Sequence, residues 1–283
     1  MTLYSRSGYE QTEKRTHRAL QHALEFARNR KLVQNKRGQL VCSDYELSAV
    51  DLRGRLKWTK ALCDELEECF DIDGDPIEGG RSFFWFCCAD VECAARRYSS
   101  LYYAPLKAIN HYRRGFRGLN YIAMLEPVIY ASFSQNRPPA LRHLNHFEQI
   151  VSWHTHGLAW GDNRKELRER FNKIEEDELY VPLLPNLKGC WAKFINPEYL
   201  GQKVAYMCKT PRVVNRVYCK NPEQFDRDCW TFQQKEAEAQ PGQHIHYFKL
   251  LAPYTLDQLA FGGGEGSEIL QRVKKPFVQR VHS

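Results

Sequence analysis

Residues 147–161 read FEQIVSWHTHGLAWG, and this stretch determines how the rest of the sequence is interpreted. Apolar and polar residues alternate along it, so it predicts a β-strand. Side chains two positions apart on a strand point to the same face, which places the imidazoles of His154 and His156 side by side. Two imidazoles on one face can present a pair of metal ligands. Gly157 follows them and leaves room for another backbone or a ligand.

The segments around this strand predict an α+β fold. Residues 119–133 (LNYIAMLEPVIYASF) are rich in β-branched and aromatic residues and predict a second strand. Further elements are expected as a short strand or helix start at 81–86, a long basic helix at 91–113, a charged helix at 162–180, a short strand at 189–197 and a helix at 198–211. This order predicts a central, mainly antiparallel sheet with helices on one face.

Three regions are expected along the chain. An N-terminal helical region spans 1–80 and ends in the Asp- and Gly-rich loop DIDGDPIEGG at 71–80. The domain that carries the histidines spans 81–215. A C-terminal extension spans 216–283 and contains FGGGEGSE at 261–268, which predicts a flexible turn or linker.

The composition predicts a folded cytosolic protein. Of 283 residues, 43% are hydrophobic and 27% are charged, which is too apolar for a disordered chain. No apolar stretch approaches the ~20 residues of a membrane span, and the N-terminus lacks the apolar centre of a secretory signal. The ten cysteines are therefore expected to be reduced, mostly buried thiols. A structural zinc on some of them is the less favoured alternative because their spacings match zinc motifs only loosely.

The net charge of +7 is unevenly distributed. Residues 61–80 hold eight acids and no base, whereas residues 93–125 hold six bases and residues 201–220 hold five, both without an acid. Two basic tracts are typical of proteins that bind a polyanion, although most charge runs are solvated surfaces.

Tyr206 and Lys209 follow fifty residues after His156, within the helix expected at 198–211. At a spacing of three they share one helix face. An ammonium beside a phenol favours the phenolate and can also pair with a phosphate oxygen. The pair therefore suggests an activated oxygen nucleophile at a phosphate-binding site.

In HTHGL (154–158) and YMCK (206–209), the chain resembles the HUH endonucleases, in particular the rolling-circle replication initiators of plasmids and single-stranded DNA phages. The resemblance covers about residues 85–215 and implies an HUH/RRM-like sheet. The sequence departs from the family pattern at Thr155, where a bulky apolar residue is usual. The resemblance implies that His154 and His156 hold Mg²⁺ or Mn²⁺, with histidine ligation favouring Mn²⁺, and that Tyr206 is the nucleophile, assisted by Lys209.

The resemblance also implies a third, acidic ligand. Glu126 is favoured because it is an isolated acid in an apolar strand, where an unpaired carboxylate is costly to bury. Glu148 is the alternative, because its even spacing from His154 would place it on the same face of an unbroken strand.

The implied reaction nicks and rejoins single-stranded or hairpin DNA at an origin through a 5′-phosphotyrosine link. The freed 3′-hydroxyl would then be extended by a host polymerase. The chain has no GxxxxGK[ST] motif, so a separate host helicase is expected. Tyr199, two turns before Tyr206, is expected to serve packing or DNA contact.

Two other functions stay open. A transposase or mobilisation relaxase would use the same chemistry. Relaxases usually place the tyrosine before the histidines, an order that Tyr206 and the second HxH pair, His244 and His246, would satisfy. A non-catalytic nucleic-acid-binding module with a structural zinc would fit the cysteines and the basic tracts.

Overall fold

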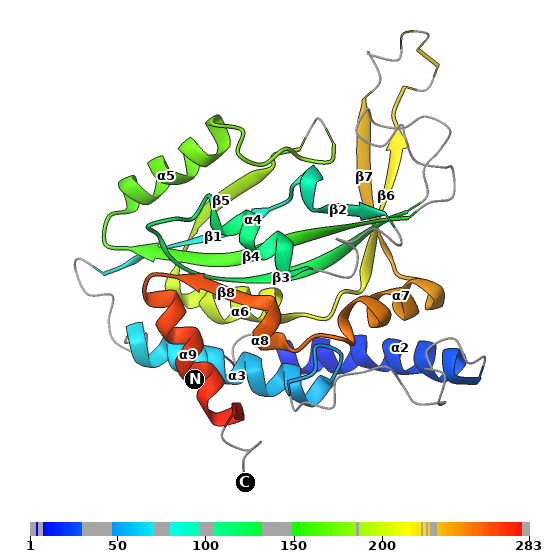
Figure 1. Ribbon diagram of the computed structural model, residues 1–283, viewed down its shortest axis with the longest axis horizontal. Coiled ribbons are helices and arrows are strands. Elements are labelled where there is room, and N and C mark those ends of the chain that lie inside the picture. Colours follow the sequence, from blue (N-terminus) through cyan, green and yellow to red (C-terminus); the bar gives the residue numbers. More distant parts are fainter. Residues whose placement is uncertain are drawn as a thin grey trace.

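The computed structural model describes residues 4, 8–29, 47–70, 80–96, 105–131, 149–184, 187–221, 223–224, 226 and 231–278. Its centre is one sheet flanked by helices, from which the β6–β7 pair extends as an arm (Figure 1). The strands are β1 (Ser82–Cys88), β2 (Ala94–Arg96), β3 (Asn120–Ala131), β4 (Ile150–Gly161), β5 (Cys190–Ile195), β6 (Val213–Cys219), β7 (Phe232–Glu238) and β8 (Ala260–Gly263). The helices are α2 (Tyr9–Asn29), α3 (Leu52–Phe70), α4 (Leu106–Arg113), α5 (Arg164–Glu176), α6 (Leu200–Cys208), α7 (Pro241–Leu251), α8 (Leu256–Leu259) and α9 (Glu265–Val278), with short 3₁₀ turns η1 (Val91–Cys93) and η3 (Pro197–Tyr199).

The predicted α+β class is confirmed, and both predicted central strands are present as β3 and β4. The strand order is β5-β1-β4-β3-β6-β7, with β2 added to β4 and β8 added to β3. The sheet is mixed rather than purely antiparallel, because β6 runs parallel to β3. Strands β4 and β5 and helices α5 and α6 lie between β3 and β6 in the sequence, and this long connection allows the chain to return in the parallel direction.

Helices cover both faces of the sheet, so the prediction of helices on one face is wrong. Phe86 of β1 packs against Phe171 of α5, whereas the next residue back, Trp85, packs against Tyr206 of α6. Alternate side chains of a strand point to opposite faces, so α5 and α6 lie on opposite sides. The sequence already carries the reason: SFFWFCC in β1 is a continuous apolar run, typical of a strand buried on both faces.

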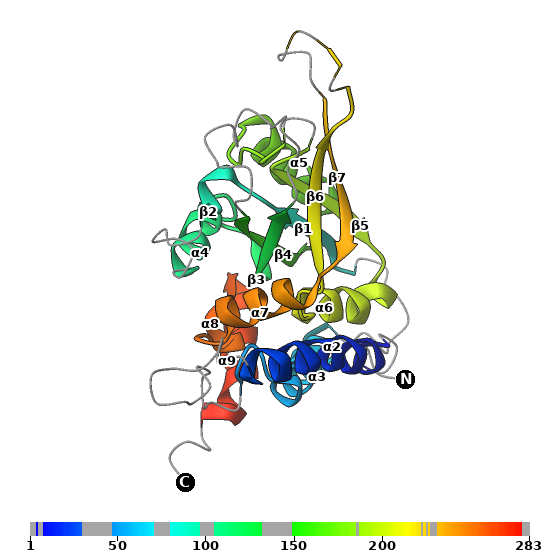
Figure 2. The ribbon, with the colours of Figure 1, turned by 90° about the vertical axis from the view of Figure 1, so that its right-hand side faces the viewer.

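The N-terminal helices lie on the α6 side of the sheet. In Figure 2, α2 and α3 run side by side next to α6. Helix α2 contacts α6 and α7, and helix α3 contacts α6 and α9. The boundaries expected at 80 and 215 stay predictions, and most of the loop at 71–80 lies outside the described residues. Structurally, β7 and β8 of the C-terminal part join the same sheet as the histidine strand.

Two predicted segments differ from the structure. The long helix expected at 91–113 is instead η1, strand β2 and, beginning only after Pro105, helix α4. The linker expected at 261–268 is strand β8 followed by the start of α9. Its glycines are required by packing, because a Cβ on Gly266 would lie 1.9 Å from the main-chain oxygen of Tyr121.

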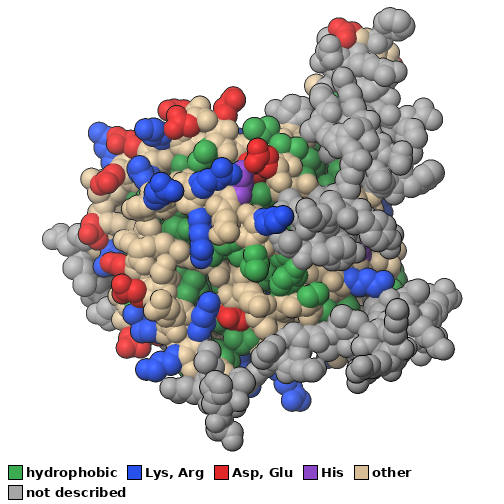
Figure 3. Space-filling view, in the orientation of Figure 1, with side chains coloured by type: hydrophobic (Ala, Val, Ile, Leu, Met, Phe, Trp, Pro, Cys, Tyr) green, Lys and Arg blue, Asp and Glu red, His purple; other side chains and the backbone are tan. Residues whose placement is uncertain are grey.

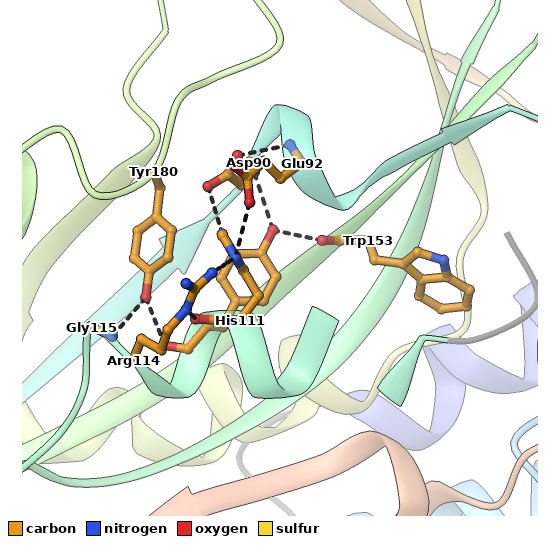
Figure 4. Close-up of polar contacts among 8 residues, drawn as sticks. Asp90, Glu92, His111, Arg114, Gly115, Trp153 and Tyr180 are labelled. Atoms are coloured by element: carbon orange, nitrogen blue, oxygen red, sulfur yellow. Dashed lines mark hydrogen bonds and ion pairs between the residues drawn. The ribbon is translucent and has the colours of Figure 1, made fainter. Parts of the chain in front are cut away.

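A buried polar network fastens α4 to the sheet (Figure 4). The Asp90 carboxylate lies 2.7 Å from His111 Nε2, and its other oxygen accepts from the main-chain nitrogen of Glu92. The hydroxyl of Tyr112 accepts from the main-chain nitrogen of Asp90 and donates to the main-chain oxygen of Trp153. Trp153 precedes His154, so this network holds the histidine strand from the far side.

Basic side chains are scattered across the middle of the face shown in Figure 3. Lys107, Arg113, Arg114 and Arg117, from the first basic tract, are exposed on and after α4. Phe116, which lies within this tract, packs on Phe86, whose side chain is on the face opposite to Trp85 and α6. The tract therefore lies across the sheet from α6. Within the described part of the chain, every helix is too short or too polar to cross a membrane.

Candidate functional site

The antiparallel pairing of β3 with β4 brings the predicted acid to the predicted histidines. Glu126 lies opposite His154, and Met124 lies opposite His156. Paired residues share a face of the sheet, so Glu126 and both imidazoles lie on the side covered by α6. His156 Nε2 donates to Glu126 Oε2 at 2.9 Å, and both residues are more than nine-tenths buried. Glu148 lies outside the described residues.

Gly157 allows the histidine strand to pack closely. A Cβ at this position would lie 2.3 Å from Cζ of Phe86 and 2.6 Å from the main-chain oxygen of Ile122. The space that the sequence predicts beside Gly157 is therefore filled by a ring and a backbone from the neighbouring strands. Thr155 is fully buried and points to the opposite face, with its hydroxyl 3.4 Å from the main-chain oxygen of Met124. The departure from the family pattern at Thr155 thus leaves the histidine face unchanged.

The predicted nucleophile lies against His156. The ring of Tyr206 meets the ring of His156 edge to face, with centroids 5.3 Å apart and an interplanar angle of 87°. Trp85 stacks on His156 with centroids 5.7 Å apart and also touches Tyr206 at 5.6 Å. Tyr206 is still 44% exposed, so a substrate in solution has access to this phenol.

Lys209 joins the carboxylate to the phenol. Its ammonium nitrogen lies 3.5 Å from Glu126 Oε1 and 3.5 Å from the centroid of the Tyr206 ring. Lys209 is not inside the helix as predicted: α6 ends at Cys208, and Lys209 is the extended C-cap residue. Its φ of −61° is still helical, so the side chain keeps the predicted spacing of three from Tyr206, and only the chain after Lys209 leaves the helix.

The electrostatics of the cluster follow from burial and pairing. Burial alone would raise the pKa of Glu126, but the Lys209 ammonium and His156 outweigh it and lower that pKa. Burial alone would lower the pKa of Lys209, but the charge of Glu126 outweighs burial and raises that pKa. In the same way, Cys87 and Glu126 overcome burial and raise the pKa of His156. The cluster thus holds an ionised carboxylate between two cations.

His154, opposite Glu126 on the neighbouring strand, has Tyr130 as its hydrogen-bonding partner. Its Nε2 lies 3.3 Å from the hydroxyl of Tyr130. Burial and the positive charge of His156 lower the pKa of His154 to about 3, so this imidazole is neutral at physiological pH. A neutral imidazole is the form that ligates metals.

The predicted metal ligands are compatible with a divalent cation in chemical type, but only two of the three are close together. Among the described residues, no group of three or more His, Cys, Asp or Glu side chains is arranged around one point. The donor set of one buried carboxylate and two imidazoles is suited to Mn²⁺. His156 Nδ1 is buried and has no geometrically well-formed hydrogen bond to any of the described residues.

The second HxH pair does not form a comparable site. His244 and His246 lie on helix α7, where residues two apart point in different directions. His244 is buried, and His246 Nδ1 lies 2.9 Å from Gln149 Oε1. Tyr199, at the end of η3, is 46% exposed.

Residues of the N-terminal helices hold the end of α6 and were not expected from the sequence. Arg55, which is 3% exposed, donates to the main-chain oxygens of Cys208 and Lys209 at 2.6 and 3.0 Å. Tyr9 donates to the same Cys208 oxygen at 2.9 Å. The buried Glu13 accepts from the main-chain nitrogen and the hydroxyl of Thr210. These contacts satisfy groups that the end of a helix otherwise leaves unpaired.

The eight cysteines within the described residues are all free thiols. Cys88 and Cys190 face each other on β1 and β5, with sulfurs 2.8 Å apart in the buried interior. Burial raises the pKa of Cys88 well above its usual value, so it is an unreactive thiol.

Comparison of the chain with models of known protein families, with curated proteins and with solved structures gives no match. A functional assignment therefore rests on the geometry of this cluster and on the motifs that predict it.

Proposed function

We propose that the protein is a metal-dependent endonuclease that nicks and rejoins single-stranded DNA, with Tyr206 as the nucleophile. One observation carries this proposal: residues from three distant parts of the chain, Glu126, His156 and Tyr206 with Lys209, lie in contact. An ordinary packing role would not require an exposed phenol above a buried His–Glu pair. The resemblance to rolling-circle replication initiators supports the same reading and points to a replication origin as the target.

In the proposed reaction, the Tyr206 oxygen attacks the scissile phosphorus and loses its proton. The bond between phosphorus and the 3′ oxygen breaks, and that oxygen leaves as a 3′-hydroxyl after taking up a proton. The products are a 5′-phosphotyrosine and a free 3′ end, so the phosphodiester energy is conserved and the reverse reaction rejoins the strand. Host polymerase and helicase are the partners that such an initiator needs.

The side chains around Tyr206 have separate tasks in this proposal. Lys209 lies against the Tyr206 ring, where its ammonium can pair with a phosphate oxygen. Glu126, His154 and His156 would hold Mg²⁺ or Mn²⁺, which supplies Lewis-acid polarisation of the phosphate when bound. Trp85 fixes the His156 ring by stacking.

The alternatives receive less support. A transposase or relaxase would share the chemistry at Tyr206, but the relaxase arrangement that uses His244 and His246 lacks a convergent pair, since α7 separates the two rings. The zinc-containing binding module leaves the cluster around Tyr206 without a role.

The decisive experiment is incubation with a pool of mixed single-stranded DNA and Mn²⁺, followed by mass spectrometry for a covalent adduct. We expect an adduct on Tyr206 and its loss in Tyr206→Phe. Tyr199→Phe is the matched control, because Tyr199 is equally exposed and lies seven residues earlier. An adduct that persists in Tyr206→Phe, or that maps to Tyr199, contradicts the proposal.

A further inference from the structure

A pocket of about 220 Å³ lies directly beside Tyr206, between helix α2 and helix α6. Tyr206, Lys209 and Gln202 contribute one wall, and Thr12 and Thr16 of α2 contribute the opposite wall. Arg212 lies at the start of β6 on the same pocket and is exposed. A segment from the first thirty residues of the chain thus lines a cavity shared with the proposed nucleophile.

The α2 wall is held at a fixed position relative to Tyr206. Glu13, between the two threonines, accepts from the main-chain nitrogen of Thr210 at 3.0 Å. Tyr9, one turn earlier, donates to the oxygen of Cys208 at 2.9 Å. Both contacts are buried and bind α2 to the residues that immediately follow Tyr206. The pocket is therefore a built feature of the site rather than a gap between independent parts.

The pocket wall carries both neutral and charged side chains, among them the buried carboxylate of Glu13, which is paired with Thr210. The hydroxyls of Thr12 and Thr16 donate back to Gly8 and Thr12 of their own helix, which leaves their oxygen lone pairs available as acceptors. The amide of Gln202 is exposed and offers both donors and an acceptor. The cations Lys209 and Arg212 are also on the pocket, with Glu236 as an exposed acid on β7. Neutral polar side chains combined with cations suit a group that has a polar ring and a phosphate.

We propose that this pocket binds the nucleoside next to the phosphate that Tyr206 attacks. The base or sugar contacts Thr12, Thr16 and Gln202, and the neighbouring phosphate pairs with Arg212. This inference rests on the proposed nuclease function and adds a substrate subsite to it. It makes α2 the element that selects the base beside the nick.

The test uses DNA randomised at the positions on both sides of the nick, with sequencing of the strands that become attached. We expect Thr12→Val and Gln202→Leu each to change the preference for the base at one flanking position by about fivefold or more. Arg212→Gln is expected to raise KM about tenfold and to leave the base preference unchanged. Gln11→Leu is the matched control, because Gln11 is exposed on α2 and does not line the pocket. Unchanged base preference in both Thr12→Val and Gln202→Leu overturns the inference.

A binding measurement separates this inference from the nuclease proposal. Fluorescence anisotropy with a labelled single-stranded oligonucleotide and the Tyr206→Phe protein needs no cleavage. Weaker binding in Tyr206→Phe combined with Gln202→Leu or Arg212→Gln supports the pocket even if the wild type forms no adduct. Adduct formation by the wild type with unaltered binding in these variants refutes the pocket and leaves the nuclease proposal intact.

Discussion

The guanidinium of Arg55 on α3 donates to the main-chain oxygen of Cys208, the last residue of α6, at 2.6 Å. The two residues are 153 positions apart, and both are buried. The carbonyl end of a helix carries partial negative charge, so a buried cation there stabilises it. The same contact fixes the turn between Tyr206 and Lys209. It therefore couples the N-terminal helices to the geometry of the proposed nucleophile.

Arg55→Met is expected to destabilise the protein and to slow adduct formation. Loss of hydrogen bonds to a charged group costs about 2–3 kcal/mol, to be measured by urea unfolding. At a temperature where the variant stays folded and with saturating DNA, the rate of adduct formation should fall about tenfold. Arg53→Met is the control, because Arg53 is exposed on the same helix and should change neither quantity. A variant that loses stability but keeps the full rate would limit Arg55 to a structural role.

Divalent cation binding is expected to depend on His156 and Glu126. His156→Ala and Glu126→Gln should each weaken Mn²⁺ binding at least tenfold in calorimetric titration, because each removes a donor from the proposed set. His246→Ala should have no effect on Mn²⁺ binding, since the ring of His246 lies on α7 and contacts Gln149. If His246→Ala weakens binding and His156→Ala does not, the metal is held elsewhere.

Mn²⁺ binding is expected to release about one proton at neutral pH. The pKa of His156 is raised by Cys87 and Glu126 against burial, so this imidazole is protonated in the metal-free protein and must lose its proton to become a ligand. Glu126, with a lowered pKa, and His154, with a pKa of about 3, are already deprotonated. Affinity should therefore rise about tenfold per pH unit through the neutral range. Titrations in buffers of different ionisation enthalpy count the protons, and a pH-independent affinity contradicts this reading.

Gly157→Ala is expected to destabilise the sheet. The added methyl group would lie within 2.6 Å of both the Phe86 ring and the Ile122 main chain, so the strands must separate. Overpacking of this kind costs about 1–3 kcal/mol, to be measured as a shift in the urea midpoint. Gly242→Ala is the control, because a Cβ there meets nothing within 4 Å and α7 should be unaffected or slightly more stable. Equal stability of the two variants would show that the strands adjust freely around residue 157.

Much of the site was predictable because it depends on local spacing. Strand periodicity predicts the shared face of His154 and His156, the cost of burying an unpaired acid favours Glu126, and the motif resemblance singles out Tyr206. The structure agrees on the shared face of Glu126, His154 and His156, since β3 and β4 pair in the register that places Glu126 opposite His154. The contact of His154 with Tyr130 was not predictable, because the sequence around either residue carries no local signal for it.

The contributions of Glu13, Arg55 and Trp85 could not be read from the sequence. Glu13 and Arg55 belong to helices that look like ordinary charged, amphipathic segments, and their partners lie about 150 or more positions away. The apolar run around Trp85 marks a doubly buried strand, but it does not say which helix covers which face. The sequence also did not indicate that η1 and β2 occupy residues 91–96, at the start of the helix expected at 91–113 with an interruption at Pro105.

The stacking of Trp85 on His156, with ring planes only 8° apart, gives the molecule an optical probe at its own centre. Indole emission responds to the charge and motion of a ring in van der Waals contact. Subtracting the spectrum of Trp85→Phe isolates this signal from the other five tryptophans. Events at the carboxylate and the phenol can then be followed in real time without any attached dye.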